Sequence, residues 1–201
     1  MVRLRRYATR ACLTLCATSV PLAVVAQPSQ QPPITVLVAY YSVTGNTEKM
    51  AEAVAEGVRS VPGASVVLKR TGEVTAEDLE AADGVILGSP TYWGNVAGPM
   101  KTFIDDWWFE YKVSLADKVG GSFASGGGES GGKENVVYSL NIAMLNGGML
   151  VTGPLIDGLG GAGVTAVDPV DDEALEACRA LGKRIAGVAR RLGVTSGRVP
   201  R

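Results

Sequence analysis

Five short apolar segments recur along residues 34–152, and helical patterns separate them. Residues 34–41 read ITVLVAYY, a continuous run rich in β-branched and aromatic residues. Such a run predicts a strand that is buried on both faces. Four further strands are predicted at residues 64–69, 84–88, 119–125 and 149–152.

The segments between these strands carry apolar residues at helical spacing. In residues 46–60, Met50, Val54 and Val58 share one face, while Glu48 and Glu52 lie mostly outside it, as in an amphipathic helix. Other helices are predicted at residues 75–82, 97–111, 134–145 and 171–192, with an irregular segment at residues 153–170.

Alternating strands and helices predict an α/β three-layer sandwich. Its five-stranded parallel sheet has the order 2-1-3-4-5 and helices on both faces. In this architecture a ligand lies beyond the carboxyl ends of the strands, at the point where the strand order reverses. Residues 34–193 form one predicted domain, and residues 194–201 form a tail.

The N-terminus has the layout of a secretory signal over residues 1–26, followed by a polar linker at residues 27–33. We therefore expect an exported, periplasmic protein without stable membrane insertion after cleavage. The adjacent arginines also fit a twin-arginine signal, which exports folded cargo. The alternative is an uncleaved anchor, or a spurious leader on a cytoplasmic protein. The pattern consists of Arg3, Arg5, Arg6 and Arg10, the apolar residues 11–26, and the small residues Val24 and Ala26.

Composition excludes several kinds of chemistry. Cleavage after Ala26 removes four of the 19 basic residues and none of the 20 acidic ones, which leaves a net charge of −5. This charge gives no reason to expect a nucleic-acid partner. The chain has no histidine, so Ser-His and Cys-His catalysis and His-ligated metals are excluded, and we predict no metal site. Only Cys178 would remain after cleavage, and its spacing from Leu181 and Ile185 predicts a core position.

The segment after the first strand is the strongest candidate for a binding site. It reads Ser42, Val43, Thr44, Gly45, Asn46, Thr47 and opens a helix. A phosphate there would meet free backbone N–H groups, the positive end of the helix and three hydroxyls. The loop lacks the lysine that nucleotide triphosphatases require, so the pattern indicates a terminal monophosphate.

Two further loops follow the third and fourth strands. The loop at residues 89–95 offers flat aromatic faces on which an isoalloxazine ring could stack. The glycine-rich loop would present N–H groups to the pyrimidine end of a flavin. Together the three loops predict flavin mononucleotide (FMN). The candidates are Ser89, Pro90, Thr91, Tyr92, Trp93, Gly94 and Asn95 in the second loop, and Ser125, Gly126, Gly127, Gly128 and Gly131 in the third.

Residues 126–131 and 158–163 both match the letters GxGxxG. The first match follows the fourth predicted strand, and the second precedes residues 164–170, which do not predict a helix. We therefore interpret neither as a dinucleotide site.

The chain resembles the flavodoxin-like superfamily, and within it the WrbA-type NAD(P)H:quinone oxidoreductases. The matching stretches are VAYYSVTGNTEKMAEAVAEGV, DGVILGSPTYWGNVAGPMKTFIDD and KVGGSFASGGGESGGKENVV. The resemblance implies an FMN on these loops, NAD(P)H as a co-substrate, a quinone-like acceptor and a homo-oligomer, often a tetramer. The family usually places a histidine near the flavin just before the fifth strand, where this chain has residues 146–148, Asn-Gly-Gly. The first loop is closer to that of plain flavodoxins.

Two functions remain open from the sequence. The first is an FMN-dependent oxidoreductase that transfers two electrons from NAD(P)H to a quinone-like acceptor, with Tyr92 as the candidate proton donor. The second is a flavodoxin-type electron carrier whose partner is a redox protein. A carrier could use an acidic face, for which the candidates are Glu77, Asp78, Glu80, Asp83, Asp105, Asp106 and Glu110. Ordinary solvated helix surface is the preferred interpretation of these residues.

Three adjacent aromatic residues, Trp107, Trp108 and Phe109, end the predicted third helix. They could wall a flavin or quinone pocket. They could also belong to the core and a subunit interface.

Overall fold

The computed structural model describes residues 33–193. The predicted signal, the tail and all of the linker except Pro33 lie outside this range, so these assignments stay predictions.

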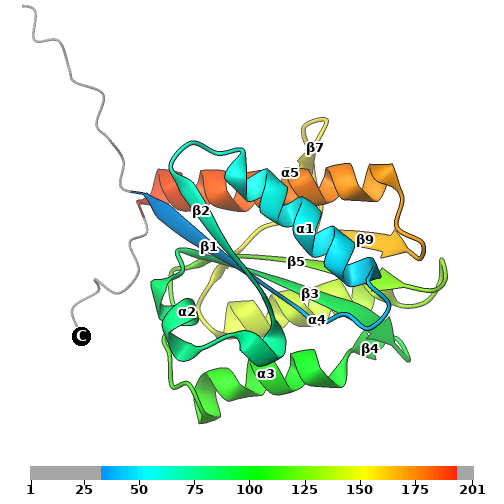
Figure 1. The fold of residues 1–201 in the computed structure, drawn as a ribbon, viewed down its shortest axis with the longest axis horizontal. Helices are drawn as coiled ribbons and strands as arrows, with labels where there is room; N and C mark the ends of the chain where they lie inside the picture. Colours follow the sequence, from blue (N-terminus) through cyan, green and yellow to red (C-terminus); the bar gives the residue numbers. More distant parts are fainter. Residues whose placement is uncertain (1–32, 194–201) are drawn as a thin grey trace, which may run out of the picture. The chain divides into compact units, whose positions relative to one another are not determined.

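The centre of the fold is a parallel sheet. Its strand order is β2 (Ala64–Arg70), β1 (Ile34–Tyr40), β3 (Gly84–Tyr92), β5 (Val119–Gly126), with β6 (Leu150–Val151) at the far edge. Figure 1 shows helices above and below this sheet. The predicted α/β sandwich and its strand order are thereby confirmed.

The fifth strand position is occupied by two short strands. Both β6 and β9 (Val164–Val167) pair in parallel with β5, with Leu150 opposite Val119 and Val164 opposite Phe123. Between them lies a small hairpin of β7 (Leu155–Ile156) and β8 (Leu159–Gly160). The prediction of a single strand at residues 149–152 and an irregular segment at 153–170 was incomplete, because two-residue strands are too short to show a periodicity.

Alternate residues of β1 face two separate cores. Val36 and Val38 pack with α1 (Asn46–Arg59) and α5 (Asp172–Leu192). Leu37 packs instead on the face that holds α2 (Ala76–Ala81), α3 (Gly98–Phe109) and α4 (Lys133–Asn146). This alternation is what a strand buried on both faces requires.

Two glycines let α1 and α5 approach closely. A Cβ on Gly57 would lie 2.0 Å from the Arg179 carbonyl oxygen, and one on Gly182 would lie 2.0 Å from that of Val54. Cys178 lies in the same layer as a fully buried free thiol, which confirms its predicted core position. Among the described residues, none of the helices is long and apolar enough to cross a membrane.

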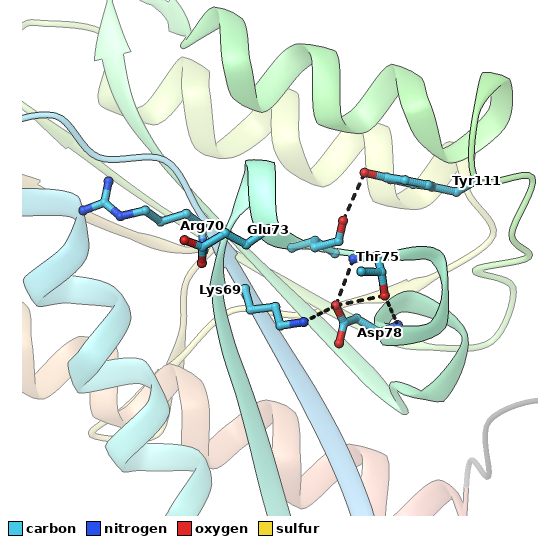
Figure 2. Close-up of polar contacts among 7 residues, drawn as sticks. Lys69, Arg70, Glu73, Thr75, Asp78 and Tyr111 are labelled. Atoms are coloured by element: carbon cyan, nitrogen blue, oxygen red, sulfur yellow. Dashed lines mark hydrogen bonds and ion pairs between the residues drawn. The ribbon is translucent and has the colours of Figure 1, made fainter.

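The segment after β2 is fastened by polar contacts. The short helix η1 (Thr71–Glu73) leads to Thr75, which caps α2 by accepting a hydrogen bond from the Asp78 N–H. Lys69 Nζ lies 2.6 Å from Asp78 Oδ2, and the Tyr111 hydroxyl donates to the Val74 carbonyl. Figure 2 shows Arg70 extending away from this cluster, and its destination is part of the candidate site.

Candidate functional site

The three predicted loops meet at the carboxyl end of the sheet. Thr47 Oγ1 and Ser125 Oγ form a buried 3.0 Å hydrogen bond, which joins the first loop to the third. A Cβ on Gly132 would lie 2.9 Å from the Gly94 Cα, so the second and third loops are also in contact. The convergence expected from the sequence is present in the structure.

The first loop ends in an open helix terminus. Gly45 adopts φ 88° as the N-cap of α1, and no described side chain caps this helix. Thr75 and Asp171, by contrast, cap α2 and α5 with their side chains. The first-turn N–H groups of α1 lack intrahelical partners by geometry, so residues 46–48 could hold a phosphate there.

The hydroxyls of the loop are organised by short-range hydrogen bonds. Ser42 Oγ accepts from the Gly45 N–H at 3.2 Å, and Thr44 Oγ1 accepts from the Asn46 side chain at 3.2 Å. Both hydroxyl protons remain available for a ligand, as predicted. Val43 is two-thirds exposed and contributes only its backbone.

Arg70 reaches this loop from the neighbouring strand, and the sequence analysis missed it. Its guanidinium donates to the Ser42 carbonyl at 2.7 Å and to both oxygens of Glu48 at 2.8 Å. It also lies 5.4 Å from the centroid of the Tyr40 ring. The predicted strand order places the end of β2 beside the first loop, and this signal could have identified Arg70.

Glu48 is the only acidic residue in the first turn of α1. Arg70 and Tyr40 together compensate its negative charge. The Tyr40 hydroxyl donates to Glu48 Oε1 at 2.6 Å. This bond and the contact with Arg70 lower the pKa of Glu48. Burial and the same carboxylate raise the pKa of Tyr40 to about 12. The negative charge of Glu48 is therefore bound within the protein and does not oppose a phosphate at the helix terminus.

The second predicted loop is mostly strand. β3 continues through Tyr92 and forms a tight hairpin with β4 (Asn95–Val96), so only Trp93 and Gly94 form the turn. The prediction placed all of residues 89–95 in a loop stiffened by Pro90, a residue that is rare within a central strand. The last hydrogen bond on the β1 side of β3 runs from the N–H of Tyr41, just after β1, to the Gly88 carbonyl. The nitrogen of Pro90, two residues further on, points to the same side, where β1 has already ended.

This hairpin presents aromatic and hydroxyl groups to the site. The Trp93 side chain is 99% exposed and Tyr92 is 41% exposed, so both have free ring surface. Burial and the neighbouring Tyr41 raise the pKa of Tyr92 above the ordinary tyrosine value, so its hydroxyl is a proton donor at neutral pH. Thr91 Oγ1 is buried and has no hydrogen-bond partner among the described residues, as expected of a group that faces a ligand.

Ser89 and Asn95 shape the hairpin. Ser89 Oγ accepts from the Ala97 N–H and donates to the Pro90 carbonyl. The Asn95 side chain donates to the Trp93 carbonyl at 3.0 Å. These two predicted binding residues therefore have roles within the chain that fix the turn.

The third loop begins later than predicted. Ser125 and Gly126 are the last buried residues of β5, and Gly126 pairs with Val167. Gly127, Gly128 and Gly131 follow in the loop, which closes with a bond from the Gly131 N–H to the Gly128 carbonyl. Gly132 then adopts φ 86° at the start of α4, and none of the described side chains caps that helix. A second open helix terminus thus lies near the first.

The other GxGxxG match, at residues 158–163, overlaps β8 and precedes the strand β9. The expectation that no dinucleotide site lies there is consistent with this placement.

Asp168, at the end of β9, was also missed by the sequence analysis. Its N–H donates to the Gly126 carbonyl. Burial raises the pKa of its carboxyl group, while Asn46 and Lys133 oppose this shift. An open groove of about 710 Å³ runs from this residue along α5 and the β7–β8 hairpin. Its rim carries Glu129, Asp157, Asp171 and Glu173, which disfavours an anionic ligand in the groove.

The aromatic end of α3 lies at the opposite edge of the sheet. Trp107 and Trp108 line a separate cavity of about 790 Å³ with Leu115 and Asn146. Figure 1 shows α3 beginning next to β4 and running away from it. A role of these aromatics as a flavin wall is therefore excluded by the topology, since helices of such a unit end at the amino edge of the strands.

Residues 146–148, which the resemblance placed near the flavin, lie at the same end of the sheet as the aromatic end of α3. A Cβ on Gly148 would contact Ala116, at the start of the segment before β5. Their Asn-Gly-Gly sequence therefore carries no information about the candidate site.

Three of the seven residues of the proposed acidic face have their charge compensated or buried within the chain. Asp78 pairs with Lys69 and Asp105 pairs with Lys101, each at 2.6 Å. Asp83 is buried and accepts a hydrogen bond from the Thr35 N–H. Within residues 33–193, no group of three or more Cys, Asp or Glu side chains could hold a metal ion.

Comparison with solved structures defines the class of this protein as flavodoxin-like. A WrbA-like flavodoxin from Agrobacterium tumefaciens superposes with a TM-score of 0.63 and 31% identity, over 79% of this chain and 98% of that one. An archaeal flavodoxin gives a TM-score of 0.66 and 27% identity, over 78% and 99% of the two chains.

The sequence comparison is more specific. The family model for NADPH-dependent FMN reductase matches residues 32–157. The chain therefore belongs to the NADPH-dependent FMN reductase family, and it is an FMN-binding protein. An NAD(P)H dehydrogenase (quinone) from Syntrophobacter fumaroxidans is 34% identical over 78% of this chain and 98% of its own length. A flavodoxin from Aquifex aeolicus is 44% identical over 75% and 84%.

Proposed function

We propose that this protein is an FMN-dependent oxidoreductase that transfers two electrons from NAD(P)H to a quinone-like acceptor. Membership of the NADPH-dependent FMN reductase family and relatives named NAD(P)H dehydrogenase (quinone) support this proposal. The observation that carries it is the meeting of the three loops around two uncapped helix termini and the unpartnered Thr91 hydroxyl. These features fit a ligand that has a phosphate at one end and a polar ring at the other.

In this proposal each loop has a distinct task. Residues 42–47 bind the FMN phosphate through the first-turn amides of α1, and Arg70 holds that loop through the Ser42 carbonyl. Trp93 covers one face of the ring, and residues 126–131 contact its pyrimidine end. Bound FMN supplies the redox chemistry. The Tyr92 hydroxyl, which stays protonated at neutral pH, is placed to donate a proton at the edge of the site.

Stopped-flow mixing of the FMN-loaded protein with NADH or NADPH tests this function. Bleaching of the flavin absorbance by either donor, followed by its return on addition of a soluble benzoquinone, is the expected result. Absence of bleaching with both donors would contradict an NAD(P)H-dependent enzyme.

A flavodoxin-type carrier is the second candidate, because the relative from Aquifex aeolicus bears that name. The ion pairs of Asp78 and Asp105 remove two of the seven proposed acidic residues from a face that a basic partner would need. Two well-separated one-electron midpoint potentials, with no reaction with NAD(P)H, would favour the carrier.

A further inference from the structure

Lys133 is a buried cation in the third loop that the sequence analysis did not single out. It is the first residue of α4, it is 3% exposed, and its Nζ donates to the carbonyls of Gly128 at 2.8 Å and Glu129 at 2.9 Å. Its side-chain stem passes beneath the loop, because a Cβ on Gly126 would lie 3.0 Å from Lys133 Cγ and 3.4 Å from Thr91 Cβ.

This position is unfavourable for a lysine on two grounds. Burial of an ammonium group costs free energy. The start of a helix carries the positive end of the helix dipole, which repels a cation. No described side chain caps α4, so Lys133 also stands where an anion-accepting terminus is otherwise open. A residue held at a cost in stability is a candidate for a functional role.

The two hydrogen bonds also fix the direction of the loop amides. In a trans peptide the C=O and N–H groups point in opposite directions. The Gly128 and Glu129 carbonyls point to the buried ammonium group. The N–H groups of the same two peptide units, which belong to Glu129 and Ser130, therefore point to the open side of the loop.

We propose that Lys133 is a positioning residue of the FMN site, which holds the Glu129 and Ser130 amides toward the pyrimidine end of the cofactor and favours its reduced form. Reduction adds negative charge to the flavin, and a cation buried beneath the same loop stabilises that charge. This inference rests on the proposed placement of FMN against the three loops.

Three variants of the full chain separate the contributions. Lys133→Met keeps the length of the stem but loses the charge and the donors. Lys133→Gln keeps a donor without the charge, and Lys133→Arg keeps both. Lys118→Met is the matched control, since Lys118 is another buried lysine, it donates to two carbonyls, and it lies at the opposite edge of the sheet.

The measurements are the FMN dissociation constant, from quenching of flavin fluorescence, and the two-electron midpoint potential, from equilibration with a reference dye. We expect Lys133→Met to weaken oxidised FMN by about tenfold and reduced FMN by at least a further threefold, which appears as a lower potential. Lys133→Gln recovers part of the affinity but not the potential, and Lys133→Arg recovers both.

Wild-type affinity and potential in Lys133→Met would overturn the inference while leaving the proposed function intact. An equal fall of affinity and potential in Lys118→Met would assign the effect to general destabilisation and overturn it as well. If Lys133→Met does not fold, the potentials of Lys133→Gln and Lys133→Arg decide in the same way. A wild-type chain that binds no FMN would instead overturn the placement of FMN itself, and this inference with it.

Discussion

One lysine is buried at each end of the parallel strands, Lys118 at the amino end and Lys133 at the carboxyl end. The two lysines have different surroundings. Lys118 donates to the Glu80 carbonyl at 3.0 Å and the Ala82 carbonyl at 2.5 Å, at the end of α2. Burial lowers its pKa, and Asp83 opposes this shift. Lys133 instead donates to a glycine-rich loop whose residues 127 and 129–131 are exposed. The same side chain thus closes a buried corner at one end and directs an exposed loop at the other.

The comparison shows that the effect of losing a buried hydrogen bond depends on whether water can reach the groups that the bond joined. Ala82 is fully buried, so the carbonyl that Lys118 satisfies has no access to water. In the exposed glycine-rich loop at the carboxyl end, water can hydrogen-bond to the carbonyls if Lys133 is lost. We therefore expect that replacing Lys118 lowers the stability of the fold, and that replacing Lys133 changes which form of the ligand is preferred.

The largest effect is expected for Lys118→Met. The buried carbonyl of Ala82 and the partly buried carbonyl of Glu80 would lose a charged donor, which lowers the free energy of unfolding of the FMN-free protein by about 3 kcal/mol. Lys133→Met should lower it by less than half as much, because water can replace the ammonium group. Urea unfolding followed by circular dichroism compares the two, and an equal loss in both variants would remove the distinction between the two ends.

The second effect concerns the phosphate. Thr47→Val removes a buried hydroxyl that lies in the first turn of α1 and bonds Ser125. We expect FMN affinity to fall by about 1.5–3 kcal/mol, as for hydrogen bonds to charged groups, while riboflavin, which has no phosphate, binds as before.

Calorimetric titration of both flavins measures this difference. Thr75→Val is the matched control, since Thr75 caps α2 away from the three loops. A parallel loss of riboflavin affinity in Thr47→Val would show that the residue supports the fold of the site and does not contact the phosphate.

A smaller effect separates the two exposed tryptophans. Trp93 stands at the tip of the β3–β4 hairpin and Trp108 near the end of α3, and they are 99% and 79% exposed. Trp93→Ser should weaken FMN by about 0.5–1.5 kcal/mol through loss of ring stacking. Trp108→Ser should leave the FMN dissociation constant unchanged. Weaker FMN binding by Trp108→Ser would place part of the site at the opposite edge.

The smallest effect at neutral pH comes from Tyr40. Its pKa is raised from 10.0 to about 12, so the folded state retains a proton that the unfolded state loses. The stability that Tyr40 contributes is therefore fully present below pH 10 and is lost as the pH rises through about 12. Absorbance at 295 nm should show a tyrosine that titrates at about pH 12, and Tyr40→Phe should remove that step. Titration of every tyrosine near pH 10 would exclude the bond to Glu48.

The parts of the site that could be predicted are those formed by residues adjacent in the sequence. The strand at residues 34–41 and the loop after it needed only a local pattern, and both were confirmed as elements of the fold. Arg70 and Lys133 were missed because their roles depend on contacts between separate segments. The boundary of the second loop was wrong because Pro90 is tolerated in β3 only where β1 has ended, and that requires the register of two strands.

The split fifth strand was beyond sequence reasoning for a related reason. Two residues of β6 and four of β9 gain their structure from pairing with β5. The aromatic end of α3 failed as a flavin wall, although the predicted parallel topology already implied that this helix ends at the amino ends of the strands.

The division of the outer strand into β6 and β9 also bears on how this protein behaves at high concentration. A long regular edge strand exposes a row of unpaired N–H and C=O groups on which another chain can add. Here that row is only two residues long at one end and four at the other, with the β7–β8 hairpin between them. The interruption therefore makes this edge a poor template for strand addition and protects the folded chain from aggregation there.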